Sequence, residues 1–120
     1  MSTTTSTFDI ESLAQSVEGQ DVEGQLAHFA DDAEITMVDS EHPPASPLRA
    51  RGRDEIRALF EDVAGRDMTH RVTHAYANGQ GGGYSVACRY STGEGVACAA
   101  LFELRDGKIS RLDGVQAWDS

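Results

Sequence analysis

Asp39 is a candidate for acid–base chemistry because of its place in the sequence. It ends a segment, Glu34–Asp39, in which apolar and polar residues alternate, and it precedes a loop that contains all three prolines of the chain. A carboxylate that is partly withdrawn from water at the mouth of a cavity has a raised pKa and can act as a general base. The alternative is that Asp39 only begins a turn, where aspartate is common. His42 lies in the same loop and could reach the same cavity mouth, although a loop histidine is usually solvated.

His70 and His74 are the next candidates, four residues apart in a segment with strand-like alternation. Four residues along a strand separate two side chains by about 13 Å, so this pair cannot hold one metal ion, and no metal site is expected. His70 alone could act as a general acid or base, because imidazole titrates near neutral pH. The alternative is a structural or surface histidine.

Cys88 and Cys98 form a possible thiol pair. If residues 91–95 make a tight turn between two strands, the two cysteines lie nearly opposite each other, with Cβ atoms about 5 Å apart. A reactive thiol needs a nearby base or helix N-terminus to lower its pKa, and the sequence indicates neither. Two small buried side chains in a reducing compartment are the simpler interpretation. No G-x-S-x-G, Walker or H-E-x-x-H pattern is present, and no cofactor is expected.

Composition limits the partners. The 120 residues suffice for one domain with its own core. The formal charge of −10 repels phosphate backbones and anionic lipids, so we expect neither nucleic-acid nor membrane partners. The first seven residues lack the basic start and apolar middle of a signal peptide. We therefore expect a disordered lead-in over residues 1–8, a single domain over residues 9–120, and a cytoplasmic location.

Helices precede most of the strands in the predicted order of elements. Asp9 and Asp21 can cap two helices, the second of which would carry Phe29 on its apolar face, and a third helix should run from residues 52–53 to Gly65. The proline-rich segment 40–50 is either the lip of a pocket or a plain spacer. Strands are expected over residues 34–39, 69–78, 84–91, 95–104 and 108–118. This order favours an α+β fold with helices packed on one side of a bent sheet.

Alternation along these strands predicts one mostly apolar inward face, which on the histidine strand includes His70, Val72, His74 and Tyr76. The residues that we expect to line a pocket are Met37, Phe60, Tyr84, Cys88, Tyr90, Cys98, Gln116 and Trp118. A surface that is mainly apolar with few polar groups suits a small-molecule site. A core filled with side chains would give the same pattern.

Three short segments resemble a known family. They are Phe29-Ala-Asp-Asp-Ala33 leading into Glu34–Asp39, then Arg51-Gly-Arg-Asp-Glu-Ile56, and finally the closing stretch 104–119 with its Asp106-Gly107 turn. In this order and spacing they resemble the nuclear transport factor 2-like superfamily, in its SnoaL-like (polyketide cyclase-like) branch, from about Ile10 to Trp118. The resemblance implies a cone-shaped, curved antiparallel or mixed sheet with three helices packed on it, which is also called a cystatin-like fold. It further implies a pocket for a small, mostly apolar molecule and a homodimer formed through the sheet.

Ketosteroid isomerases belong to the same superfamily, and the resemblance argues against their activity here. Alignment of the matching segments places Met37 at the general base, Leu13 at the oxyanion-hole tyrosine and Cys98 at the neutral aspartic acid. Asp39 could be a displaced base, but no oxyanion donor and no inward-facing arginine are expected. The expected function is cofactor-free proton transfer, a cyclisation or isomerisation of a small carbonyl compound, with Asp39 and His70 as catalytic candidates. The alternative is a non-catalytic module of the same fold that binds a small apolar molecule or dimerises.

Overall fold

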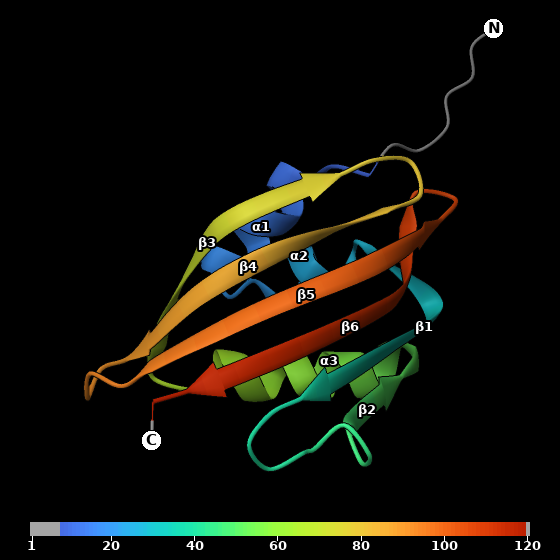
Figure 1. Ribbon diagram of the computed structural model, residues 1–120. Coiled ribbons are helices and arrows are strands. Elements are labelled where there is room, and N and C mark those ends of the chain that lie inside the picture. Colours follow the sequence, from blue (N-terminus) through green and yellow to red (C-terminus); the bar gives the residue numbers. More distant parts are fainter. Residues whose placement is uncertain (1–7, 120) are drawn as a thin grey trace, which may run out of the picture.

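Six strands and three helices make up the part of the chain that this computed structural model describes, residues 8–119 (Figure 1). The helices are α1 (Ile10–Glu18), α2 (Val22–Leu26) and α3 (Gly52–Ala64). The strands are β1 (Phe29–Val38), β2 (Leu48–Arg51), β3 (Met68–Ala77), β4 (Gly81–Tyr90), β5 (Gly95–Arg105) and β6 (Lys108–Trp118). Residues 1–7 of the expected lead-in lie outside the described residues.

All six strands form one curved, mixed sheet in the order β2-β1-β6-β5-β4-β3. Only β1 and β6 run parallel, whereas every other neighbouring pair is antiparallel. The three helices lie against the same concave side of the sheet, and the opposite face is left uncovered (Figure 1). This arrangement confirms the predicted α+β architecture with three helices on a bent sheet.

The helix starts follow the predicted capping residues. The Asp9 carboxylate accepts hydrogen bonds from the backbone amides of Glu11 and Ser12, and Asp21 accepts one from Gly24. These bonds satisfy amides that have no partner inside the helix. The four largest fully buried side chains are Leu13, Leu26, Ile56 and Ile109. Helices α1, α2 and α3 are therefore each held to the sheet by at least one buried aliphatic side chain.

Strand β4 begins three residues earlier than predicted, at Gly81, and the largest differences from the predicted elements concern β1 and β2. Strand β1 begins at Phe29, five residues earlier than expected, so Phe29 belongs to the sheet, where it pairs with Ile109, and not to the second helix. The prediction was wrong because an apolar residue every three or four positions also fits a short helix followed by a strand. Strand β2 was not predicted at all. It forms an edge of the sheet beside β1 and begins directly after the last proline, so the prolines remain outside it.

A β-bulge in β3 turns two of the residues that we expected to face inward. The pairing with β4 shifts between Val72 and His74, so that His74 lies opposite Ser85 and its imidazole contacts the Ser85 hydroxyl. Beyond the bulge, Tyr76 lies on the outer face and is 66% exposed. A bulge adds one residue to one strand and so reverses which side chains face which way. The prediction that His74 and Tyr76 share a face with His70 is therefore wrong.

Candidate functional site

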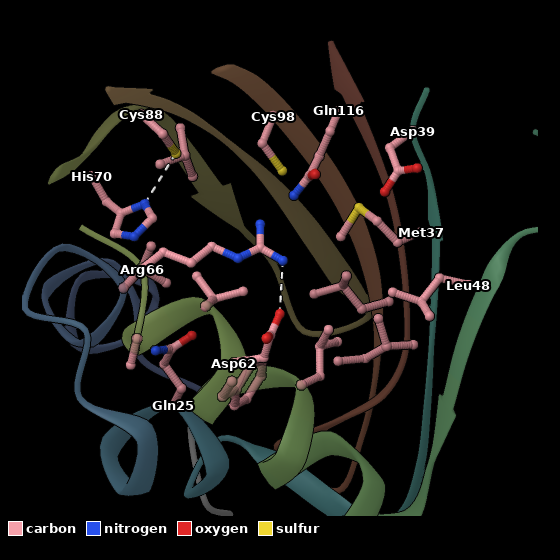
Figure 2. Close-up of a pocket in the computed structure, with 18 of the residues that line it drawn as sticks. Gln25, Met37, Asp39, Leu48, Asp62, Arg66, His70, Cys88, Cys98 and Gln116 are labelled. Atoms are coloured by element: carbon pink, nitrogen blue, oxygen red, sulfur yellow. Dashed lines mark hydrogen bonds and ion pairs between the residues drawn. The ribbon is translucent and has the colours of Figure 1, made fainter. Parts of the chain in front are cut away.

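A cavity of about 360 Å³ lies between the inner face of the sheet and the helices (Figure 2). Its apolar wall includes Ile35, Leu59, Phe60, Val86 and Leu112. The volume falls within the lower part of the range of small-molecule sites, which suits a ligand of one or two rings. The inner face of the sheet is therefore hollow in the structure, not a filled core.

Seven of the eight side chains that the sequence placed in a pocket line this cavity: Met37, Phe60, Tyr84, Cys88, Cys98, Gln116 and Trp118. Met37 lies across β6 because Gly114 leaves room for it, since a Cβ at Gly114 would come within 2.7 Å of the Met37 Cε. Tyr90 is not among the lining residues. It stands at the end of β4, opposite Met68, where its phenol interacts with Arg66. Alternation gave Tyr90 the correct side of the strand but could not show that the cavity ends before it.

The structure places Asp39 and His42 together at the cavity wall. The Asp39 Oδ1 accepts a hydrogen bond from the His42 Nδ1 at 2.9 Å, and the backbone amides of Glu41 and His42 bond to the same oxygen at 2.9 Å each. Burial alone would raise the pKa of Asp39, but these hydrogen bonds stabilise the carboxylate and hold its pKa below the ordinary value of 3.8. The expectation of a raised pKa is therefore wrong. Asp39 is a fixed, charged partner that orients the His42 imidazole.

His70 also lines the cavity, and it is paired with a thiol. Its Nδ1 lies 3.0 Å from the Cys88 Sγ, and its Nε2 is buried without a hydrogen-bond partner among residues 8–119. Burial lowers the pKa of His70 and raises the pKa of Cys88. Both shifts favour a neutral imidazole beside a neutral thiol over an imidazolium–thiolate pair.

The second cysteine is not opposite the first. Cys88 pairs with Val96, and Cys98 pairs with Val86, so the two thiols are diagonal neighbours on the same face. The register differs from the prediction because β4 and β5 pair as far as Arg89 and Gly95. Each residue of β4 therefore lies opposite a β5 residue two positions earlier than predicted. Both cysteines are free thiols. Burial, with a contribution from the nearby Cys88, raises the pKa of Cys98 to about 11, although its hydrogen bond with Gln116 opposes this rise.

Arg66 lines the cavity, so the expectation that no arginine faces inward is wrong. It follows the end of α3, and its Nη2 donates to the Asp62 Oδ2 at 2.7 Å. Figure 2 shows its side chain extended from the end of the helix into the space that the lining residues surround. Burial opposes the charge, but Asp62 and Tyr90 outweigh it and raise the pKa of Arg66. The spacing of Asp62 and Arg66, four residues apart at a helix end, was the only available signal, and it is also typical of ordinary surface pairs.

A family model for the SnoaL-like domain matches residues 10–112. The chain belongs to this family. In contrast, no curated protein matches the chain at a significant level. The family assignment agrees with the resemblance carried by the closing stretch and the two upstream segments.

Solved structures share the fold of this SnoaL-like domain at low sequence identity. A nuclear transport factor 2-like protein of unknown function from Mesorhizobium loti is 16% identical, with a TM-score of 0.76 over 88% of this chain and 85% of that one. A hypothetical protein from Catenulispora acidiphila with a ketosteroid isomerase-like fold, in complex with trimethylamine, is 19% identical, with a TM-score of 0.63 over 87% and 81%. A computationally designed 17-OHP binder is 21% identical, with a TM-score of 0.64 over 87% and 86%. These similarities establish the fold alone.

None of the helices formed by residues 8–119 of the SnoaL-like domain is long and apolar enough to cross a membrane. The same residues contain no group of three or more histidine, cysteine, aspartate or glutamate side chains placed to hold a metal ion.

The pH dependence of stability tests the environment of His70 in this SnoaL-like domain. Because the pKa of His70 is below 6.5 in the folded chain, the unfolded chain takes up a proton at this residue first as the pH falls. Stability should therefore decline below about pH 6.5, and His70→Gln should remove part of that decline. Melting temperatures at several pH values on either side of this point measure the effect, with His74→Gln on the outer face as the control. Equal pH slopes in wild type and His70→Gln would contradict the partly buried position of His70.

Proposed function

We propose that this protein binds a small, mostly apolar carbonyl compound in its cavity and moves a proton on it without a cofactor, as in an isomerisation or a cyclisation. The apolar wall accounts for binding the body of such a ligand, because burial of apolar surface is the main source of affinity in small-molecule sites. The polar groups are few and lie around that wall, where they can contact the functional group of the ligand.

The observation that carries the proposal is the bond between Asp39 and His42 at the wall of the cavity. A carboxylate that binds one ring nitrogen of a histidine fixes the ring and leaves the other nitrogen to exchange a proton with a ligand. The Asp39 side chain is only 8% exposed, and its charge stabilises the imidazolium that forms when His42 accepts a proton. We therefore assign the base to His42, with Asp39 as its positioning residue. His70, the other catalytic candidate, lies at the same cavity, but its Nδ1 is bonded to Cys88 and its Nε2 is buried.

Steroid isomerisation remains disfavoured by the residues at the family's catalytic positions. Met37 and Cys98 line the cavity but are not carboxylic acids, and Leu13 is 1% exposed in the core. The alternative function is binding without catalysis. It is favoured by the low pKa of Asp39, which makes this carboxylate a poor base, and by the existence of a designed binder on the same fold.

Proton exchange with solvent tests the proposal without knowledge of the natural product. The probe is 2-tetralone, a two-ring ketone with acidic protons next to its carbonyl group. We expect it to raise the melting temperature of the protein, as any ligand of the folded state does. We also expect the protein to accelerate replacement of its α-protons by deuterium in D₂O, followed by proton NMR. Stabilisation without accelerated exchange would instead support the non-catalytic alternative. The absence of both effects, with 2-tetralone and with a panel of cyclic enones, would refute the proposal that the cavity binds carbonyl compounds.

We also propose that two copies pair through the outer face of the sheet. The residues of this outer patch are Tyr76, Ala87, Ala97, Ala99, Leu101, Val115 and Ala117, and all of them are exposed. Their positions on neighbouring strands make the patch continuous, since Ala87 pairs with Ala97 and Ala97 with Ala117. Contiguous exposed apolar surface of this kind is typical of a protein–protein interface. A second copy of the chain is the occupant that we expect, because the alanines at the centre of the patch let two sheets approach closely.

The double substitution Leu101→Glu and Val115→Glu should convert the dimer to a monomer. Leu101 and Val115 are 64% and 57% exposed in the single chain, so glutamate is tolerated there unless a partner covers it. Burial of unpaired carboxylates in an interface costs several kcal/mol, about 1,000-fold or more in the dissociation constant. Light scattering after size exclusion measures the mass. The control is Glu103→Gln, also exposed on β5, and a wild-type protein that is monomeric would rule out the pairing.

A further inference from the structure

We propose that Arg66 holds the carbonyl oxygen of the ligand and stabilises the negative charge that develops there, so that the preferred ligand is a neutral ketone that becomes an enolate only in the cavity. This inference rests on the proposed function. It supplies the oxyanion donor that the sequence lacked at the family's expected positions.

The geometry of Arg66 leaves it able to bind a ligand. A guanidinium has five N–H donors, and the interactions with Asp62 and Tyr90 leave others available. The side chains of Arg66 and Asp62 are 39% and 63% exposed, and an ion pair at such exposure contributes little to stability. The guanidinium can therefore turn donors toward an oxygen in the cavity without a large loss of free energy.

The charges around the cavity favour a neutral ligand. Arg66 is the only lysine or arginine in its lining among the described residues, whereas Asp39, Glu41 and Asp62 contribute three carboxylates. A ligand that arrives as a carboxylate would meet this excess of negative charge. A neutral ketone avoids the repulsion on entry, and the charge that it gains during the reaction forms next to Arg66. An interaction that strengthens as the charge develops lowers the barrier and does not merely tighten binding.

The reaction moves one proton and two electron pairs. The His42 Nε2 takes a proton from the carbon next to the carbonyl group, the C–H electron pair forms the carbon–carbon double bond, and the carbonyl π pair moves onto the oxygen that Arg66 binds. The enolate then takes a proton from His42. Protonation at a conjugated carbon is isomerisation, and protonation at the same carbon after His42 has exchanged its proton with solvent is hydrogen exchange. In a cyclisation, the enolate carbon attacks a second carbonyl group of the ligand, and the new alkoxide takes the proton from His42.

A phenol that resembles the enolate tests the role of Arg66 directly. The probe is 2-naphthol, whose oxygen corresponds to the enolate oxygen of 2-tetralone and whose absorption spectrum distinguishes phenol from phenolate. We expect the ratio of phenolate to phenol for bound 2-naphthol to be about tenfold higher in wild type than in Arg66→Gln at the same pH, because a hydrogen bond to a charged group is worth about that much. Arg66→Lys should lie between them, since it keeps the charge and loses the planar fork.

Two matched variants complete the experiment. Arg71→Gln removes an arginine that is exposed on the outer side of β3 and should behave as wild type. Tyr84→Phe removes a buried phenol whose pKa is raised by burial and which therefore stays a neutral O–H donor in the cavity wall. If the ratio of phenolate to phenol for bound 2-naphthol falls in Tyr84→Phe but not in Arg66→Gln, Tyr84 and not Arg66 holds the oxygen. If the ratio falls equally in Arg71→Gln, the effect of Arg66 is a long-range effect of charge and not a direct contact. If wild type does not bind 2-naphthol, as judged by an unchanged melting temperature, but does bind 2-tetralone, the role of Arg66 in holding an enolate oxygen is refuted while the carbonyl-binding function stands.

Discussion

His42→Gln lowers the rate of proton exchange in 2-tetralone by at least about 100-fold, while the affinity for the ketone changes by no more than a few fold. A positioned general base contributes about 10²- to 10⁴-fold to a rate, and glutamine cannot accept and return a proton near neutral pH. Glutamine keeps an amide that can still donate to the Asp39 carboxylate, so the loop around residues 39–42 should remain folded. Exchange measured by NMR at a series of ketone concentrations separates kcat from KM, and the loss should fall on kcat.

The matched control is Asp39→Asn. Asparagine can still accept the hydrogen bonds from the backbone amides of Glu41 and His42, but it removes the charge that stabilises a protonated His42. Its effect on kcat should therefore be smaller than that of His42→Gln and in the same direction. Full exchange activity in His42→Gln, combined with its loss in His70→Gln, would show that His70 is the base and that the bond between Asp39 and His42 only shapes the loop.

Local chemistry made much of the fold predictable. Asp9 and Asp21 begin helices because their side chains satisfy free amides, and the Asp106-Gly107 turn joins two strands with both residues at positive φ, of 53° and 78°. A two-residue hairpin turn with this conformation favours Asp-Gly for steric reasons. Such features depend on a few adjacent residues, and the sequence therefore predicts them.

The candidate site was less predictable because it depends on contacts between distant elements. The inward face of β4 followed from simple alternation, yet the bulge after Val72 has no local signature and turned His74 outward. Arg66 reaches the cavity only because α3 ends beside it, and no pattern near residue 66 shows how that helix lies on the sheet. The bond between Asp39 and His42 forms across a short turn, so the sequence allowed the two residues to meet but did not reveal that their contact would lower the pKa of Asp39.

Ile56→Ala should lower the free energy of unfolding by about 3 kcal/mol, within the usual range of 2–5 kcal/mol for such a truncation. Ile56 is completely buried on α3, which packs against β1, so the lost methyl groups leave a void that the surrounding backbone can close only in part. Ile56→Val is the matched control and should cost about 1 kcal/mol. Denaturant unfolding at a fixed protein concentration measures both values, provided that the slope with denaturant stays constant. Equal losses in the two variants would mean that α3 can settle onto the sheet without Ile56.

The same substitution should weaken ligand binding, because α3 carries much of the cavity wall. Leu59, Phe60, Asp62 and Val63 all lie on this helix, and Arg66 follows its end. A domain of this size has a total stability of about 5–15 kcal/mol, so a loss of about 3 kcal/mol at the residue that fixes α3 also allows the helix to detach more often. Stabilisation by 2-tetralone should then be smaller in Ile56→Ala than in Ile56→Val. Equal stabilisation would show that the ligand is held by the sheet alone, and that Arg66 and the helical wall contribute nothing to its binding.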